Sequence, residues 1–240
     1  MGQKKIFEKS NEITAIPELL KLLDLNDRII TIDAMGYQRA ICEQIIKQNG
    51  DYLIAVKGNQ KTLFEGIKKY FDDKIKSEQD EEISSWIEHS RGHGRIEERR
   101  SFALDNIESL PNHNLWPGLA SIGMIISTRH IIKTNKTSSE TRYYISSLQA
   151  DAEKFCKTAR IHWGIENKLH WRLDVVFNED KACIQNENSA ENMDIIRKWA
   201  LNILHKAKTK PDQSIKSLQR KASMSFKHLA SILKGGMGDA

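Results

Sequence analysis

The sequence has few cysteines and no long apolar run, and each absence excludes a class of protein. Its three cysteines, Cys42, Cys156 and Cys183, are odd in number and far apart. That pattern fits neither a disulfide framework nor a cysteine-rich zinc site. It is typical of a reducing compartment, so we expect a cytoplasmic location. No apolar stretch approaches the roughly 20 residues that cross a bilayer, and the first 13 residues contain no apolar core of a secretion signal. We therefore expect no membrane partner.

Positive charge is concentrated at the C-terminal end. The whole chain has a net charge of +5 over 240 residues. From His205 onward eight Lys or Arg and two Asp give +6, so the rest of the chain sums to −1. A positive tail on a nearly neutral body suggests an acidic polymer as partner, and nucleic acid is the commonest one. A solvated basic helix without a partner is the alternative.

The first 73 residues alternate between helical and strand-like patterns. With 39% hydrophobic and 29% charged residues, the chain is typical of a soluble globular protein. The predicted elements are a helix over 12–25, a strand that ends at Asp33, a helix from about Tyr37 closed by Gly50, a strand over 51–56 and a helix over 60–73. This order predicts a parallel sheet flanked by helices.

A different pattern follows a charged connection at 72–82. Four strand-like stretches separated by polar connections predict an antiparallel β region spanning 84–148. Helical character returns over 151–174, and Ser189 is a candidate N-cap for the next helix. The predicted strands and the last two predicted helices cover 84–90, 95–105, 121–132, 141–148, 190–208 and 214–235.

Asp33 ends an apolar run, RIITIDAMG, that predicts a buried strand. A carboxylate at the C-terminal edge of such a strand stands where open α/β sheets place their ligands. An aspartate that merely initiates a turn is the alternative.

A second candidate acid, Glu166, falls on the predicted inward face of the helix over 151–174. It shares that face with Phe155, Ala159, His162, Leu169 and Leu173. An acid there is unfavourable unless it is paired or binds a metal. Pairing with His162 or Arg160 is one explanation. A zinc site of His162, Glu166 and His170 is another, although the HExxH order is absent. The third is a Mg²⁺ site shared with Asp33, since that ion prefers sparse carboxylates.

Several stretches together resemble the DDE transposases of bacterial insertion sequences, of the H-repeat-associated type. They run in order from residue 2 to 204: KSNEITAIPELL, TIDAMG, YLIAVKGNQKTL, RGHGRIEER, WPGL, RYYISSL, HWGIENKLHWRLDVVFNED and ENMDIIRKWALNIL. The resemblance implies DNA transposition, in which water attacks a phosphodiester at the transposon end and the freed 3′-hydroxyl attacks target DNA. It implies Mg²⁺ or Mn²⁺ as cofactor, with Asp33 and Glu166 as the second and third catalytic acids and as metal ligands.

The resemblance also implies a ribonuclease-H-like α/β fold with a β insertion before its last catalytic helix. The family's first Asp lies in an IDGK-type motif, and this sequence contains none. We therefore expect an α/β core incomplete at its N-terminal strands, in a truncated product without activity of its own. The expected segments are a partial core (1–73), an antiparallel β insertion (84–148), the segment of the catalytic helix (151–204) and a basic helical tail (205–240). A non-catalytic DNA-binding remnant or a host-adopted interaction domain is the alternative.

The partner implied is double-stranded DNA, as transposon ends and as target, with a homodimer on DNA as an open option. In the stretch RGHGRIEERR, alternation puts Arg95, Glu97 and Arg99 on one face of a strand, where a Gly-His-Gly loop allows close approach to phosphates. A salt-bridged surface hairpin is the alternative. For Lys57 and Asn59 the alternatives are DNA contact or capping of the next helix. The full set of candidate DNA contacts is Lys57, Asn59, His93, Arg95, Arg99, Arg160 and His162. We expect Trp163 and Trp171 to pack in the core or against helices rather than to stack on bases.

Overall fold

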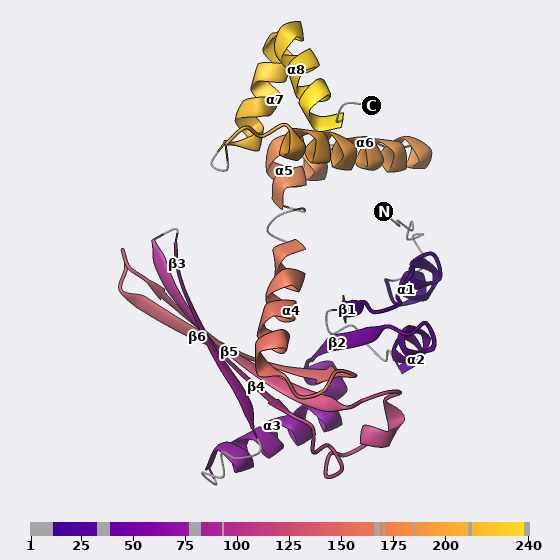
Figure 1. Ribbon diagram of the computed structural model, residues 1–240, viewed down its shortest axis with the longest axis vertical. Coiled ribbons are helices and arrows are strands. Elements are labelled where there is room, and N and C mark those ends of the chain that lie inside the picture. Colours follow the sequence, from indigo (N-terminus) through magenta and orange to yellow (C-terminus); the bar gives the residue numbers. More distant parts are fainter. Residues whose placement is uncertain are drawn as a thin grey trace. The chain divides into compact units, whose positions relative to one another are not determined.

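The computed structural model describes two units of the chain, Met1–His162 (unit 1) and Trp163–Ala240 (unit 2), shown in Figure 1. The description leaves out residues 1–11, 33–38, 77–82, 93, 166–168, 170, 185, 211–212 and 238–240. It also leaves out the side chains at 12–14, 75–76, 165, 180, 187 and 237.

Unit 1 is built on a six-stranded sheet in the order β1-β2-β6-β5-β4-β3. The strands are β1 (Ile29–Ile32), β2 (Asp51–Val56), β3 (Ser84–Gly92), β4 (Arg95–Leu104), β5 (Ser121–Ile131) and β6 (Lys136–Ser146). β1 and β2 are parallel, and the other neighbours are antiparallel. Both orientations were expected from the sequence. The antiparallel strands join the parallel pair in a single sheet, because Ile54 of β2 pairs with Ile145 of β6.

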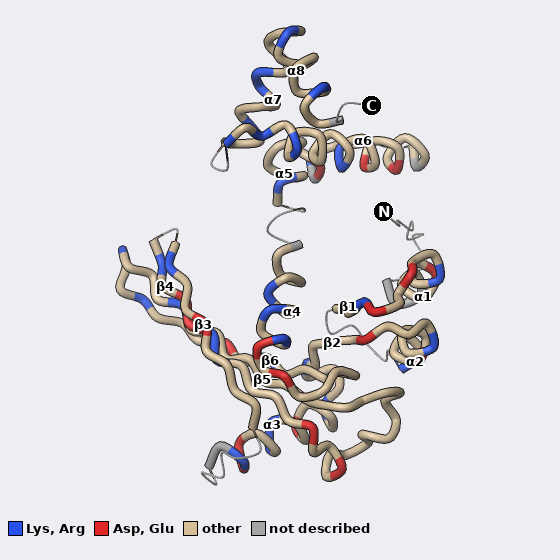
Figure 2. The backbone as a smooth tube through the Cα atoms, viewed as in Figure 1, with Lys and Arg blue, Asp and Glu red and all other residues tan. Residues whose placement is uncertain are grey.

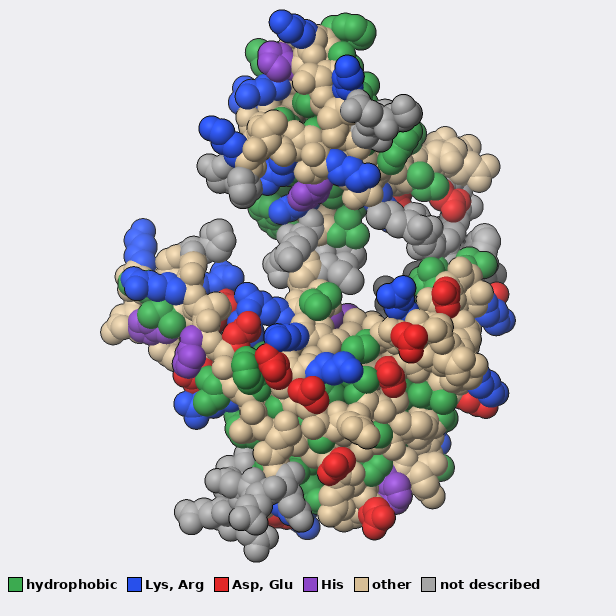
Figure 3. All heavy atoms as spheres, viewed as in Figure 1, with side chains coloured by type: hydrophobic (Ala, Val, Ile, Leu, Met, Phe, Trp, Pro, Cys, Tyr) green, Lys and Arg blue, Asp and Glu red, His purple; other side chains and the backbone are tan. Residues whose placement is uncertain are grey.

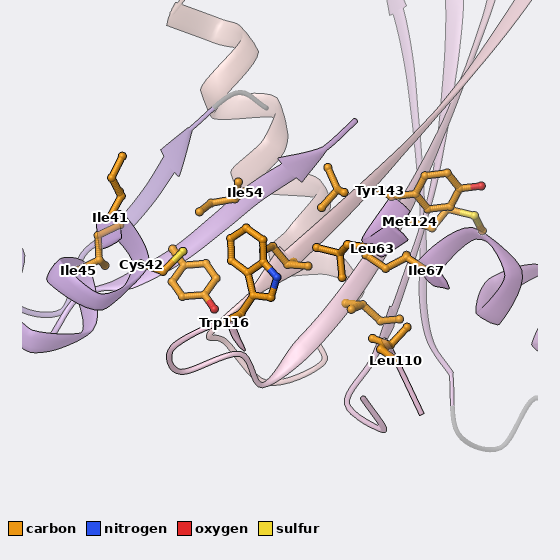
Figure 4. Close-up of a cluster of buried hydrophobic side chains, with 14 of the residues drawn as sticks. Ile41, Cys42, Ile45, Ile54, Leu63, Ile67, Leu110, Trp116, Met124 and Tyr143 are labelled. Carbon is orange, nitrogen blue, oxygen red and sulfur yellow. The ribbon is translucent and has the colours of Figure 1, made fainter. Parts of the chain in front are cut away.

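Helices cover both faces of this sheet. The helical segments of unit 1 are α1 (Glu12–Leu20), α2 (Arg39–Lys47), η1 (Gly58–Gln60), α3 (Lys61–Lys76), η3 (His113–Leu115) and α4 (Ala152–Ile165). On one face, buried Leu63 and Ile67 of α3 belong to a core with Ile54, Met124 and Tyr143 of the strands (Figure 4). These strand residues alternate with those of the opposite face, as a sheet covered on both sides requires.

On the opposite face, α4 packs directly on the strands. Phe155 of α4 is fully buried, in a core that includes Leu53, Ala103 and Tyr144. Gly123 of β5 makes this close approach feasible, because a Cβ at that position would lie 2.5 Å from Phe155 Cδ2. Close packing of this kind is sensitive to the addition or removal of a single methyl group.

Two local details of unit 1 differ from the sequence prediction. β6 begins at Lys136, five residues before the predicted start at 141, although residues 136–140 are polar and exposed. They pair with β5 without an apolar face to cover, so alternation could not reveal them. The left-handed residue after α2 is Asn49 (φ 56°), whereas Gly50 was expected to close the helix. The Gly50 N–H donates to the Ile45 carbonyl over 3.0 Å, as in a Schellman motif.

Unit 2 is a small helical unit with its own core. Its elements are α5 (Trp171–Phe177), η5 (Glu179–Lys181), α6 (Glu187–Lys206), α7 (Ile215–Met224) and α8 (Phe226–Met237). Buried Leu173, Leu204 and Leu218 lie in this core. Asn186 caps α6 by accepting a hydrogen bond from Ser189 N–H over 3.1 Å, so the predicted cap at Ser189 is wrong by three residues. In the part of the chain that the structure describes, no helix is both long and apolar enough to cross a bilayer.

The apolar residues predicted to form one inward helix face over 151–174 are divided between two separate cores. Phe155 and Ala159 are buried against the sheet of unit 1, whereas Leu169 and Leu173 pack in unit 2. A periodicity of 3.6 residues identifies an apolar stripe but does not show which neighbour covers each part of it. Glu166 lies outside the described residues.

His205 near the end of α6 makes the stability of unit 2 depend on pH. Burial lowers the pKa of His205 below its ordinary 6.5, and the positive charges of Arg172 and Lys208 lower it further. Because the unfolded chain takes up the proton more readily, stability is complete above about pH 6.5 and falls as the pH drops below it, by at most about 1.4 kcal/mol per pH unit. Hydrogen exchange of α6 peptides at pH 7.5 and 5.5 measures this loss. We expect His205→Gln to remove this contribution and His228→Gln, at an exposed site, to leave it unchanged.

Candidate active site

The C-terminal ends of β1 and β2 lie at one edge of the sheet because the two strands are parallel and Ile32 pairs with Ile54. In the sequence, Asp33 directly follows β1 and Lys57 directly follows β2. An edge of this kind is where open α/β sheets place reactive groups. Asp33 itself lies outside the described residues.

A hydrogen bond joins this edge to α4. Nδ1 of His162 and Oγ1 of Thr31 are 3.0 Å apart. Thr31 is two residues before Asp33, and His162 is four residues before Glu166. The structure therefore brings Thr31 and His162 into direct contact, whereas Asp33 and Glu166 both lie outside the described part of the chain.

Arg160, one of the candidate DNA contacts, binds an acid on the first strand of the β3–β4 hairpin. Its Nη1 is 2.5 Å from Glu88 Oε1. The other oxygen of Glu88, Oε2, lies 3.6 Å from Nη1 of Arg99 on β4. The same helix is attached to β3 at its start, where the Ala152 N–H donates to Ser84 Oγ over 3.0 Å. α4 therefore contacts both edge strands, β3 through Arg160 and β1 through His162.

Glu97 extends these contacts along the hairpin. It forms an ion pair with Arg99, its Oε1 lies 2.6 Å from Arg95 Nε, and the same atom lies 3.3 Å from Arg129 Nε on β5. The Glu97 side chain is 13% exposed. Burial raises the pKa of its carboxyl, but Arg99, Arg95 and Arg129 together hold this pKa below its ordinary 4.5.

We call the connected residues the ion-pair chain. With four arginines and two glutamates, it carries a net charge of +2. Figure 3 shows Lys and Arg side chains gathered where Figure 1 draws the free end of β3–β6. The members of the ion-pair chain are Arg160, Glu88, Arg99, Glu97, Arg95 and Arg129.

The structure thus confirms that Arg95, Glu97 and Arg99 share one face, and that the hairpin is salt-bridged. It also brings Arg160 to them, which the sequence reading did not foresee. Glu88 and Arg129 were missed, because they become neighbours only through the strand register, in which Glu97 pairs with Arg129. No signal within a single stretch of sequence could have identified them.

The other residues singled out in the sequence do not belong to the ion-pair chain. Lys57 and Asn59 are exposed at η1, and Lys57 makes no side-chain cap to it. His93 lies outside the described residues. Trp171 is 58% exposed, so it does not lie in the core, which was one of the two roles expected for it. The short α5 uses Leu173 and Val176 for its buried face.

Metal binding was expected from Asp33 and Glu166. Among the described residues, no group of three or more His, Cys, Asp or Glu is arranged to hold a metal ion. Both expected ligands fall outside this set, and so does His170 of the zinc alternative. The carboxylate oxygens of two acids are a donor set of the kind that suits Mg²⁺ or Mn²⁺.

Comparison with known proteins identifies the family. The family model described as "Transposase DDE domain" matches residues 3–203. The chain is 45% identical over 238 residues both to "Putative protein YbfL" and to "H repeat-associated putative transposase YhhI" of Escherichia coli strain K12. These matches cover 98% of this chain and 62% of each relative.

A protein of Xanthobacter autotrophicus, "Uncharacterized protein in dhlA 3'region", is 38% identical over 63% of this chain and 50% of its own length. No solved structure is significantly similar to the chain. The match to the family model spans most of this sequence, and the match to YhhI covers nearly the whole of it. The chain therefore belongs to the DDE transposase family, and it is of the H-repeat-associated type.

Proposed function

We propose that this chain supplies two of the carboxylates, Asp33 and Glu166, for DNA transposition by metal-dependent phosphodiester hydrolysis and strand transfer. The observation that carries the proposal is the 3.0 Å hydrogen bond between His162 and Thr31. It joins the strand that leads into one acid to the helix that leads into the other. Family membership supports the same assignment.

Each part of the chain has a distinct role in this proposal. A bound Mg²⁺ or Mn²⁺ supplies charge for a phosphoryl oxygen and lowers the pKa of an attacking water. Asp33 and Glu166 provide its hard oxygen ligands. His162 and Thr31 are positioning residues, because their hydrogen bond holds the end of α4 beside the end of β1.

The proposed DNA contacts belong to two groups of residues in unit 1. Lys57 and Asn59 follow β2 at the same edge of the sheet as Thr31. The ion-pair chain begins at Arg160, two residues before His162 in α4. Its net positive charge favours the phosphates of a duplex. In this arrangement Glu88 and Glu97 orient the arginines and reduce their attraction for phosphate.

Replacing either acid is expected to weaken Mn²⁺ binding by at least tenfold, because each removes a charged ligand from a set of only two. Paramagnetic resonance of free Mn²⁺ measures this binding without any need for activity. Asp33→Asn and Glu166→Gln are compared with Asp105→Asn, which changes an exposed acid of the loop after β4. Equal Mn²⁺ binding by all the variants would contradict the proposal.

Strand cleavage provides a separate test. With Mg²⁺ or Mn²⁺, we expect the chain alone to leave the 3′ ends of a transposon-end duplex uncut, because the sequence has no IDGK-type motif to supply the first acid. Specific nicking that disappears in both Asp33→Asn and Glu166→Gln would show that a further acid completes the set. Sedimentation of the chain on the same duplex determines whether it binds as a homodimer.

A further inference from the structure

The charges of unit 2 are divided along the chain. Residues 163–204 contain seven acidic and five basic residues, whereas residues 205–240 contain eight basic and two acidic ones. The sequences of α7 and α8 contain Lys and Arg but no Asp or Glu. Figure 2 shows the same division, with acidic positions on α6 and only basic ones on α7 and α8.

The buried faces of α7 and α8 direct these basic residues outward. α7 buries Ile215 and Leu218 in the core of unit 2, and α8 buries Ile232 in the same core. A Cβ at Gly236 of α8 would lie 2.5 Å from Ile203 Cγ2 of α6, so α8 packs tightly there. The exposed residues on the outer sides include Lys216, Arg220, Lys221, Lys227 and Lys234.

Two large apolar side chains project at the junction between the helices. Met224 is 81% exposed and Phe226 is 84% exposed, more than any other large hydrophobic residue among those described. They stand on either side of Ser225, whose extended backbone (φ −153°, ψ 124°) separates α7 from α8. The sequence pattern had predicted one continuous helix here. In the sequence, Lys221 and Lys227 flank the exposed pair.

We propose that the α7–α8 hairpin (Ile215–Met237) is a second binding site for duplex DNA, separate from the candidate active site. Its Lys and Arg side chains contact phosphates, and Phe226 and Met224 act as an apolar wedge at a base step. Basic residues around such a wedge are how proteins bind and kink a duplex through its minor groove. The site is independent of the metal-binding acids and requires only that DNA is a partner, as the proposed function holds.

Helices with basic and apolar residues also bind anionic membranes, but the distribution of apolar residues disfavours that partner. A helix at a membrane surface needs a continuous apolar face turned toward the lipid. In α7 and α8 the apolar faces are occupied by the core of unit 2. Among the described large apolar side chains of α7 and α8, only Met224 and Phe226 at the junction are more than half exposed.

Fluorescence anisotropy of a labelled 20-base-pair duplex of arbitrary sequence tests the proposal with the full chain in the absence of divalent metal. Lys216→Gln/Arg220→Gln is compared with Lys68→Gln/Lys69→Gln, which removes the same charge from exposed positions of α3. We expect the α7 pair to weaken binding at least fivefold and to reduce the log–log salt slope by about 2. The α3 pair is expected to do neither.

The contribution of Met224 and Phe226 is measured separately from that of the charges. Met224→Ala/Phe226→Ala is expected to weaken duplex binding at least fivefold while leaving the salt slope unchanged, because no charge is lost. Circular dichroism confirms that this variant keeps its helices. Equal effects of the α7 and α3 pairs would overturn the proposal, and so would preferential binding to phosphatidylserine vesicles. The chain could also bind a single strand more tightly than the duplex and lose this binding in Met224→Ala/Phe226→Ala. That result would overturn the wedge and show that the two side chains stack on single-stranded bases.

These outcomes are independent of the active-site acids. If Asp33→Asn and Glu166→Gln leave Mn²⁺ binding unchanged while the α7 pair still weakens duplex binding, the proposed function fails and the second DNA site stands. If the acid variants weaken Mn²⁺ binding but the α7 pair leaves duplex binding unchanged, the proposed function stands and the second DNA site fails.

Discussion

Phe155→Ala is expected to lower the free energy of unfolding of unit 1 by about 3–5 kcal/mol, the usual range for truncating a fully buried Phe. Phe155 is the contact through which α4 packs on Gly123. Loss of this contact also loosens the helix that carries His162, so Mn²⁺ binding is expected to weaken together with stability. Urea unfolding followed by circular dichroism measures the first effect, and Mn²⁺ resonance measures the second.

The opposite change at the same contact provides the control. Gly123→Ala places a Cβ 2.5 Å from Phe155 Cδ2 and is expected to cost about 1–3 kcal/mol by overpacking. In the double variant, the cavity left by Phe155→Ala accommodates the added methyl group. The combined loss is therefore expected to be smaller than the sum of the two single losses. Simple additivity would show that the two residues do not share a contact.

Glu97→Gln is expected to destabilise the β3–β4 hairpin and to strengthen DNA binding. Loss of the carboxylate removes the partner of Arg95, Arg99 and Arg129, which costs about 1.5–3 kcal/mol at neutral pH. Because the pKa of Glu97 is lowered in the folded protein, the wild-type advantage is present above about pH 4.5 and disappears as the pH falls through the folded pKa. Hydrogen exchange of β4 peptides between pH 3 and 7 follows this loss.

The same substitution raises the net charge of the ion-pair chain by one. Arginines released from Glu97 become available to phosphates, so duplex affinity at low salt is expected to rise roughly three- to tenfold with a steeper salt slope. Glu98→Gln is the matched control, because Glu98 is the next residue of β4 on the other face, where it pairs with Arg100. If both variants strengthened binding equally, general charge and not the ion-pair chain would account for the effect.

The elements that could be predicted from the sequence are those with a regular pattern of apolar and polar residues. The parallel β1–β2 pair and the antiparallel arrangement of β3–β6 follow from apolar periodicity and turn residues, which are local signals. The start of β6 at Lys136 was missed because its first five residues have no buried face. The break at Ser225 was also missed, since no Pro or Gly stands between 214 and 234 to mark the end of a helix.

The candidate acids were predicted from a different kind of signal. Asp33 and Glu166 stand out because a carboxylate is unexpected at the end of an apolar run or on an inward helix face. Thr31 gave no such signal, although its contact with His162 is what joins the two segments. Arg160 was identified as a candidate, but its partner Glu88 is 72 residues away in sequence. Pairings of this kind depend on sheet register, which is set by the whole fold.

The position of β2 in the sheet has a consequence for the order of events during synthesis. Its second neighbour, β6, is far along the chain: the Ser146 hydroxyl that donates to the Tyr52 carbonyl is 94 residues away. At the usual rates of translation, β2 therefore waits roughly 5–20 s after it is made before β6 exists to pair with it. During that interval the cores that bury Leu53 and Ile54 on the two faces of the sheet are incomplete, because both include residues of β6. Nascent chains of this protein are thus expected to need a chaperone most between the completion of β2 and that of β6.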